Sequence, residues 1–165
     1  MTVAPTLTLR QADYTNPQHM RALLDLLDGY ARDPMGGAEP LSDFARANLP
    51  QALAARPFMF SVLAFDATGL PVGLVNCVEG FSTFACQPLV NVHDVVVLAS
   101  HRGQGVAAQM LALVDQLARA RGACKLTLEV LEGNTPAQKL YLRLGFENYQ
   151  LDPSMGLAQF MQKWL

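Results

Sequence analysis

Apolar residues recur at helical spacing near the start of the chain. Asn16 is a favourable N-cap residue, and Pro17 suits the first turn of a helix. The apolar positions that follow share one face of a helix: Met20, Leu23, Leu24 and Leu27. This pattern predicts a helix that runs to about Ala31. A second helix is predicted from a cap at Ser42 to about Ala54.

From Phe58 onward the pattern changes to short, β-branched, alternating runs. The runs Phe58–Asp66 and Pro71–Phe81 are separated by a turn at Thr68–Gly69, which is typical of an antiparallel hairpin. A further strand is predicted over Leu89–Leu98. A weakly alternating stretch, Leu7–Arg10, is expected to form a short first strand.

The second half of the chain alternates between helix and strand. Helices are predicted over Gly105–Arg121 and Pro136–Leu144, and strands over Lys125–Val130, Glu147–Gln150 and Leu157–Lys163. The order of elements is helices, an antiparallel meander and one strand–helix–strand crossover into a parallel pair. We therefore expect an α/β (α+β) fold with a mixed sheet in three layers, with about six or seven strands and four helices.

Composition limits the class of protein. A chain of 165 residues with 51% hydrophobic and 16% charged residues is long enough for one domain with a buried core. The net charge of −2 provides no basic surface for nucleic acid. The sequence shows neither a signal peptide nor an apolar run of membrane-spanning length, so we expect a cytoplasmic protein that binds no membrane. The three cysteines lack the spacing of metal ligands, so no metal site is expected.

A glycine-rich turn precedes the helix predicted at 105–121. Gly103 and Gly105 allow main-chain N–H groups to approach a ligand closely, and the helix presents the positive end of its dipole there. These features together favour phosphate groups. A tight turn with a purely structural role is the alternative.

The same glycines also fit a dinucleotide-binding fingerprint. Gly103, Gly105 and Ala108 match G-x-G-x-x-G/A, and Glu129 lies about twenty residues further on. However, the segment LASHR separates Val97 from the first glycine, which normally follows its strand almost directly. An antiparallel hairpin also precedes the motif, although the motif usually opens its domain. An NAD(P)-dependent oxidoreductase is therefore kept only as an alternative.

Residues 102–107, RGQGVA, also satisfy the pattern [RQ]-x-x-G-x-[GA]. A second motif follows at a fixed separation, with Asn134, Ala137, Leu140, Tyr141, Gly145 and Phe146. Together these motifs resemble the GCN5-related N-acetyltransferase (GNAT) superfamily, closely over about residues 58–149 and in outline before that. The resemblance implies one N-acetyltransferase domain over 1–165, in which 1–57 is a helical substrate-side segment and 58–165 is the sheet and cofactor-binding core.

The resemblance also implies a site for acetyl-coenzyme A as cosubstrate. Main-chain N–H groups of the glycine-rich turn would hold the pyrophosphate, and the central strand would pair with the pantetheine arm. The implied cofactor-binding residues are Val95, Val97, Arg102, Gly103, Gln104, Gly105, Val106, Ala107, Asn134, Ala137 and Tyr141. For Arg102 a solvated turn residue is the alternative, and for Asn134 a helix N-cap.

Acetyl transfer to an amine needs a base for the amine and an acid for the departing thiolate. Tyr141 occupies the family's usual acid position. His93 is the first candidate for the base, because an imidazole is largely neutral at pH 7. Asp94, Glu129 and an ordered water are the alternatives. Strand alternation would put His93 on one face together with Asn91, Val95 and Val97.

The expected acceptor is a small primary amine, bound by Tyr30, Glu79, Phe81 and Asn91, with the loop 33–40 as a mobile lid or an ordinary turn. Direct transfer requires no cysteine nucleophile, so Cys77, Cys86 and Cys124 are expected to be small buried residues. A homodimer is possible by resemblance. The alternative function is a non-catalytic acyl-coenzyme A sensor.

Overall fold

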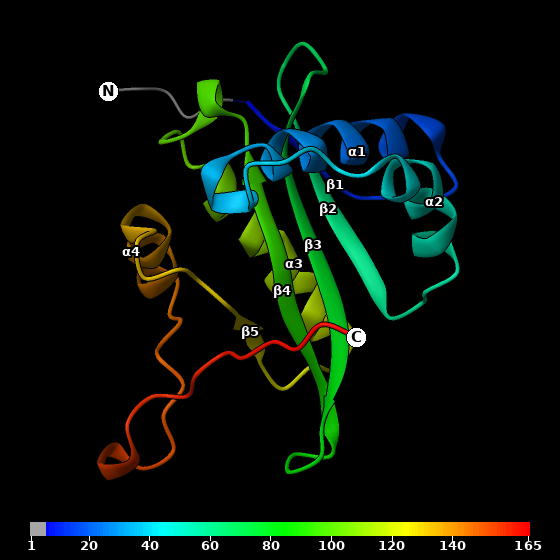
Figure 1. The fold of residues 1–165 in the computed structure, drawn as a ribbon. Coiled ribbons are helices and arrows are strands. Elements are labelled where there is room, and N and C mark those ends of the chain that lie inside the picture. The colour runs from blue at the N-terminus through cyan, green and yellow to red at the C-terminus, as the bar shows by residue number, and fades with distance from the viewer. Residues whose placement is uncertain (1–5) are drawn as a thin grey trace. The chain divides into compact units, whose positions relative to one another are not determined.

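Five strands form one mixed sheet in the computed structural model, which describes residues 6–165 (Figure 1). The strands are β1 (Thr8–Gln11), β2 (Met59–Phe65), β3 (Pro71–Ser82), β4 (Gln87–Val97) and β5 (Leu126–Leu128). They lie side by side in chain order, antiparallel from β1 to β4 and parallel between β4 and β5. The predicted meander and parallel pair are therefore confirmed.

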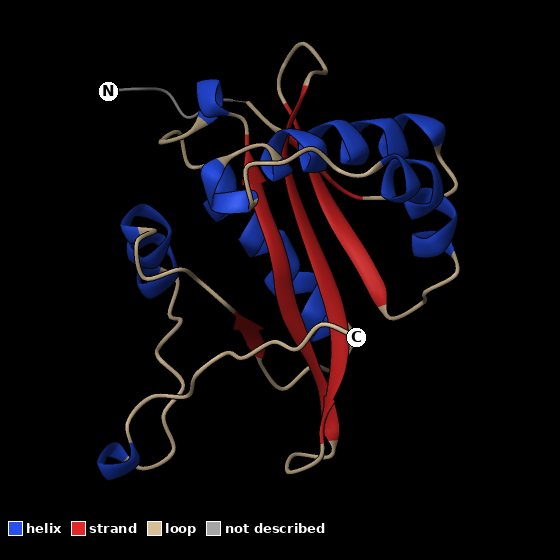
Figure 2. Ribbon diagram, in the orientation of Figure 1, coloured by secondary structure: helices blue, strands red, loops and turns tan. Residues whose placement is uncertain are grey.

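Four α-helices accompany the sheet: α1 (Pro17–Ala31), α2 (Asp43–Ala54), α3 (Val106–Ala120) and α4 (Thr135–Arg143) (Figure 2). The predicted caps are confirmed, because Asn16 Oδ1 accepts hydrogen bonds from the N–H groups of Gln18 and His19, and Ser42 Oγ accepts one from Ala45. These side chains replace the carbonyl partners that the first N–H groups of a helix lack.

The chain divides after Leu128 into two compact units. The first holds the sheet with α1, α2 and α3, and the second, from Glu129 onward, holds α4 and the C-terminal segment. The single domain over 1–165 stays a prediction.

Within the first unit, helices cover both faces of the sheet. On one face, Leu23 and Leu26 of α1 are buried in one cluster with Leu63, Leu74 and Val96 of three neighbouring strands, and α2 contributes Leu53. On the other face, a Cβ on Gly73 would lie 2.8 Å from the side chain of Met110 and 3.1 Å from Val106, both in α3. The three expected layers are thus present.

A β-bulge interrupts β4 at His93. Asp94 pairs with Asn76 of β3 but Val92 pairs with Cys77, so His93 has no partner on β3. An extra residue reverses the alternation of faces beyond it. The expectation that residues 91, 93, 95 and 97 share one face is therefore wrong, because paired residues share a face and the bulge places Asn91 opposite to Val95.

The two strands predicted near the C-terminus are absent. Residues 147–150 and 157–163 adopt no regular secondary structure, so the sheet has five strands rather than six or seven. Large apolar side chains there are exposed, at 77% for Phe160 and 84% for Met161. The alternation in this segment therefore does not correspond to a buried face.

Asp28 links α1 to Leu41, just before α2, and to Arg46 within α2. Its carboxylate accepts hydrogen bonds from Arg32 Nε at 2.9 Å and from the Leu41 N–H at 3.0 Å, and it pairs with Arg46 Nη1 at 2.9 Å. Arg32 and Arg46 have the largest influence in lowering the pKa of Asp28 to about 2, and the Leu41 N–H lowers it further.

We predict that Asp28→Asn weakens the dependence of stability on acid pH. A lowered native pKa means that the carboxylate stabilises the fold above about pH 4 and loses this effect as the pH falls toward 2. The variant should have a lower Tm than wild type at pH 7, and the two Tm values should converge near pH 2. Thermal unfolding at a series of pH values measures this difference. Asp25→Asn, an equal charge change on the exposed side of α1, is the control, and parallel curves for wild type and Asp28→Asn would contradict the prediction.

Candidate functional site

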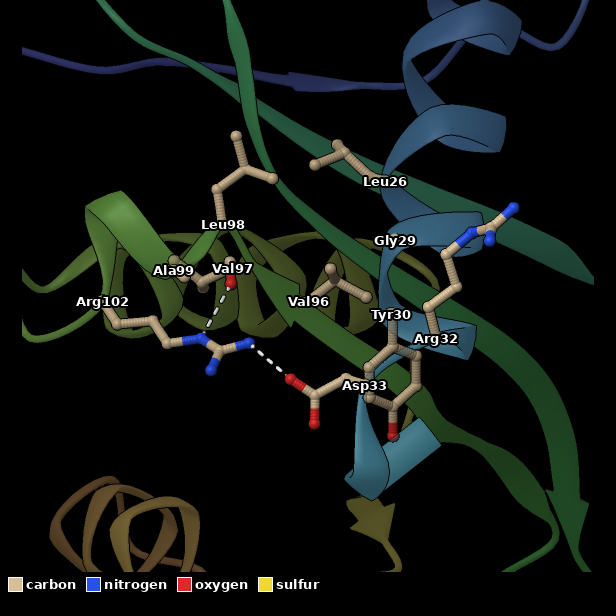
Figure 3. Close-up of a pocket in the computed structure, with 10 residues that line it drawn as sticks. All are labelled: Leu26, Gly29, Tyr30, Arg32, Asp33, Val96, Val97, Leu98, Ala99 and Arg102. Atoms are coloured by element: carbon tan, nitrogen blue, oxygen red, sulfur yellow. Dashed lines mark hydrogen bonds and ion pairs between the residues drawn. The ribbon is translucent and has the colours of Figure 1, made fainter. Parts of the chain in front are cut away.

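A cavity of about 320 Å³ opens in the first unit, between the C-terminal end of α1 and the end of β4 (Figure 3). The short 3-10 helices η1 (Pro34–Gly36) and η2 (Ala99–His101) flank it. Its walls come from these elements and the residues next to them: Leu26, Gly29, Tyr30, Arg32, Asp33, Val96, Val97, Leu98, Ala99 and Arg102. Of the residues predicted for substrate, Tyr30 lies here.

Arg102 connects the glycine-rich turn to the far side of this cavity. Its Nε donates to the main-chain oxygen of Val97 at 3.1 Å, and its Nη2 donates to Asp33 Oδ2 at 3.1 Å (Figure 3). The guanidinium therefore already has partners within the protein. Arg102 links the loop at Asp33 to the turn, and its side chain remains 58% exposed.

The main chain of the turn is suited to binding an anion. Gly103 and Gly105 have φ angles of 74° and 80°, and nothing lies within 4 Å of a Cβ built on either residue. The N–H groups of residues 103–105 donate to no acceptor within the part of the chain that the structure describes. Gln104 braces the turn, because its Nε2 donates to the Ser100 oxygen at 2.9 Å. Open space, unpaired donors and the start of α3 together make a cradle that fits a diphosphate.

The edge of β4 beyond Val92 is also available. β5 pairs with β4 only across Val90–Val92, so no strand within residues 6–165 pairs with residues 93–97 on that side. The Leu98 N–H donates to Val72 on the β3 side. Because main-chain groups alternate along a strand, those of Val95 and Val97 point to the free edge, where the Val97 oxygen accepts from Arg102 Nε. They are the two residues predicted to pair with an extended arm of a cosubstrate.

A row of polar side chains crosses the face of the sheet that α1 covers. Tyr14 Oη lies 2.8 Å from Ser61 Oγ, Ser61 Oγ donates to Asn76 Oδ1 at 2.6 Å, and Asn76 Nδ2 donates to Asp94 Oδ2 at 3.0 Å. Ser61 is 0% exposed and Asn76 is 5% exposed. Neither residue was predicted from the sequence to belong to a site. The available signal was a polar residue inside an otherwise apolar strand.

Tyr30 lies close to two carboxylates. Its hydroxyl donates to the Met35 oxygen at 3.3 Å. Burial raises the pKa of Tyr30, and the negative charges of Asp94 and Asp33 raise it further. Tyr30 therefore stays neutral at physiological pH, beside groups that favour a cation.

The other residues predicted for substrate lie elsewhere in the first unit. Glu79 pairs with Arg121 Nη1 at 3.7 Å, and the guanidinium of Arg121 stacks 4.3 Å above the ring of Phe60, next to the end of α3. Phe81 is 59% exposed on the β3–β4 hairpin, and Asn91 Nδ2 donates to Thr127 Oγ1 at 3.2 Å. Their positions do not bring these three residues together with Tyr30.

The second unit holds the other predicted motif. Asn134 is the N-cap of α4, and its Oδ1 accepts from the Ala137 N–H at 3.3 Å, so the capping alternative is observed. Tyr141 is buried, with its ring edge-on to Phe146 at a centroid distance of 5.8 Å. Gly145 ends the helix at a φ of 90° and lets the Phe146 N–H donate back to the Tyr141 oxygen. These contacts hold Phe146, just past the end of α4, against Tyr141 in its last turn.

The three thiols differ in environment. Cys77 is buried, and burial raises its pKa to about 12. Cys86 and Cys124 are exposed, so the expectation that all three would be buried is wrong for these two.

Residues 6–165 contain no cluster of three potential metal ligands, and none of their helices has both the length and the apolar character needed to cross a bilayer.

A sequence model of the Acetyltransferase (GNAT) family matches residues 20–146, well over half of the chain. Two curated relatives match over shorter stretches. "Uncharacterized N-acetyltransferase YycN" of Bacillus subtilis (strain 168) is 43% identical over 56 residues, which are 34% of this chain and 36% of the relative. Streptothricin acetyltransferase of Streptomyces lavendulae is 33% identical over 95 residues, 56% of this chain and 50% of the relative. The chain thus spans half or less of the length of these relatives.

The fold is also that of solved acetyltransferase structures. The structure of AAC(6')-Iy in complex with the bisubstrate analogue CoA-S-monomethyl-acetylneamine superposes with a TM-score of 0.75 at 22% identity, covering 97% of this chain and 99% of that one. At this identity the likeness establishes the fold, and the fold expected from the two sequence motifs is confirmed.

We predict that an alkylating reagent modifies two of the three cysteines in the folded protein and leaves the third unmodified. A buried thiol with a raised pKa carries little reactive thiolate, whereas exposed thiols react readily. Iodoacetamide at pH 8 should therefore modify Cys86 and Cys124 in the folded protein, and Cys77 only after denaturation. Peptide mass spectrometry locates the adducts, and rapid labelling of Cys77 in the native state would contradict this assignment.

Proposed function

Because this chain belongs to the Acetyltransferase (GNAT) family, we propose that it transfers an acetyl group from acetyl-coenzyme A to the primary amine of a small molecule. The glycine-rich turn before α3 is the observation that carries the proposal. The N–H groups of residues 103–105 are unpaired in the described structure, and nothing lies within 4 Å of a Cβ built on Gly103 or Gly105, both of which have a positive φ. A diphosphate would satisfy these donors and interact favourably with the dipole of α3.

The reaction needs two proton transfers. Acetyl-coenzyme A supplies an electrophilic carbonyl and a thiolate leaving group. The amine nitrogen forms a bond to the carbonyl carbon and loses a proton, the carbon–sulfur bond breaks, and the sulfur gains a proton. In our proposal the hydroxyl of Tyr141 gives the proton to the sulfur, and His93 accepts the proton of the amine directly or through a water molecule.

The open edge of β4 supplies the remaining interactions. Main-chain groups of Val95 and Val97 would hydrogen-bond an extended pantetheine arm as an added strand does. The unpaired N–H groups on this edge would polarise the thioester carbonyl as charge develops on its oxygen. The main chain of residues 102–107 would hold the pyrophosphate. Asn134 and Ala137, at the start of α4, are proposed to contact the cosubstrate arm.

A small amine is the acceptor that the first unit supports best. Tyr30 and Asp33 line a cavity of about 320 Å³, which suits a small molecule. One relative is named a streptothricin acetyltransferase, and AAC(6')-Iy was solved with an analogue that joins CoA to acetylneamine. Both names indicate amine-bearing small molecules, and we extend this class to the present chain.

We predict that Gly105→Ala weakens binding of coenzyme A by at least about tenfold. Alanine at a positive φ costs about 1–2 kcal/mol, and its Cβ would project into the open space that the ligand has to enter. Isothermal titration calorimetry measures the affinity. Gly122→Ala, with a φ of 75° and equal open space at the other end of α3, is the matched control.

Both alanine variants should lose similar stability, but only Gly105→Ala should lose affinity. Equal affinity of the two variants for coenzyme A would remove the glycine turn from the binding site. If wild type binds NADH rather than coenzyme A, the dinucleotide alternative replaces our proposal.

We predict that Tyr141→Phe lowers kcat by about 100-fold or more, since a positioned acid contributes roughly 10²–10⁴-fold. The affinity for coenzyme A should change little, because the ring remains. Thiol release measures turnover, and Tyr149→Phe is the control at an exposed tyrosine of the same unit. An unchanged kcat would exclude Tyr141 as the acid. Coenzyme A binding by wild type without turnover on any amine would favour a sensor.

A further inference from the structure

The hydrogen bonds in the buried polar row on the α1 face all run in the same donor-to-acceptor direction. Ser61 has a single hydroxyl proton, which it donates to Asn76 Oδ1. Ser61 must therefore accept from Tyr14, whose hydroxyl lies 2.8 Å away. The Asn76 amide then donates to Asp94 at 3.0 Å. All the donors of the row thus point toward the Asp94 carboxylate.

Burying these polar side chains on the sheet face costs free energy unless each of them is hydrogen-bonded. Ser61 and Asn76 are almost fully buried among apolar neighbours, where each polar group is tolerated only when it is hydrogen-bonded. Apolar residues at both positions would avoid that requirement. A chain of aligned hydrogen bonds strengthens its members and fixes the last acceptor in one orientation.

Asp94 is at the open end of the row. The bulge at His93 places its side chain on the α1 face, where Val96, two residues further along β4, lines the cavity. Its Oδ2 accepts from Asn76, whereas its Oδ1 accepts no hydrogen bond from residues 6–165. Asp94 does not itself line the cavity, but its charge influences Tyr30, which does.

We propose that Tyr14, Ser61 and Asn76 position Asp94 to bind the ammonium group of the acceptor, with Asn76 as the residue that orients the carboxylate. This inference rests on the proposed function and adds to it the residues that recognise the charge of the amine. The acceptor enters as a cation, and its nitrogen is held at Oδ1 of Asp94 beside His93. Neutral acceptors such as alcohols lack the charge that this carboxylate recognises.

The groups around Asp94 define what a pH experiment reports. Its charge influences Tyr30 at the end of α1, and it also influences Cys77, which follows Asn76 in β3 but lies on the opposite face of the sheet; His93 adjoins it in β4. An alkyl ammonium group keeps its charge from pH 4 to 8. Because His93 adjoins Asp94, the readout is the difference between the KM profiles of the variant and of wild type for the same amine, and not the profile of wild type alone.

Asn76→Asp tests the proposal. The new carboxylate keeps the acceptor for Ser61 but faces Asp94 with a like charge, and two neighbouring carboxylates raise the pKa of one of them. The pH below which KM rises should move upward by at least about one unit, while the Kd for coenzyme A stays within about twofold of wild type. The assay uses whichever of n-butylamine, 1,4-diaminobutane, lysine and neamine wild type acetylates fastest, and circular dichroism checks folding at each pH.

Tyr14→Phe removes the distant end of the row without leaving a large cavity. We expect about a threefold rise in KM for the amine with little change in kcat or in the Kd for coenzyme A. Tyr149→Phe is the matched control. This variant decides the question if Asn76→Asp does not fold.

The outcomes separate the two proposals. If wild type does not bind coenzyme A, the proposed function fails. If it binds and acetylates an amine but the folded variants keep the KM of wild type and its pH dependence, the row is structural only and the inference is overturned while the function stands. If wild type binds coenzyme A but acetylates none of the four amines, the inference also fails.

Discussion

The pairing of β3 with β4, together with the one-residue bulge in β4, determines which side chains of β4 face α1 and which of its main-chain groups lie at the free edge. Before the bulge at His93, the register is set by the hairpin, and beyond it the alternation of faces is reversed. Without the extra residue, Asp94 would turn away from α1 and lose Asn76 as its partner. The same strand leaves its last residues free of β5, so one strand supplies a polar face, a cavity wall and an open edge.

The glycine turn depends on this strand in another way. It follows the end of β4 through η2, and the Arg102 side chain returns to the Val97 oxygen. The turn is thus fastened to the strand by a side chain while its own N–H groups stay unpaired. A binding site for an anion is more effective when its donors are held in place before the ligand arrives.

Much of this could be predicted from the sequence, because local signals decide it. Asn16, Ser42 and the glycines at 103 and 105 act within a few residues, and the hydrophobic periods of α1, α3 and the hairpin agree with their burial. The bulge could not be predicted, since it depends on the register between two strands. The same is true of the partners of Glu79 and Asn91.

The two strands predicted near the C-terminus are the opposite kind of error, because the local pattern was present but no strand formed. Alternation over residues 157–163 predicts a strand only where a partner edge and a buried face exist, and the apolar side chains there are exposed. Asn76 and Ser61 illustrate a missed signal. A polar residue inside a fully apolar strand requires a partner, and that requirement indicates a network even before its members are known.

The two ends of α3 are held by unrelated means. At its start the turn is braced by Gln104 and Arg102, and just past its end Arg121 stacks on Phe60 and pairs with Glu79. Between these ends, Gly73 lets the helix approach the sheet closely. The helix therefore has little freedom to slide or tilt. The entropy of orienting its amide dipoles is lost when the protein folds. A diphosphate bound at the start of α3, as proposed, would therefore not have to order these dipoles.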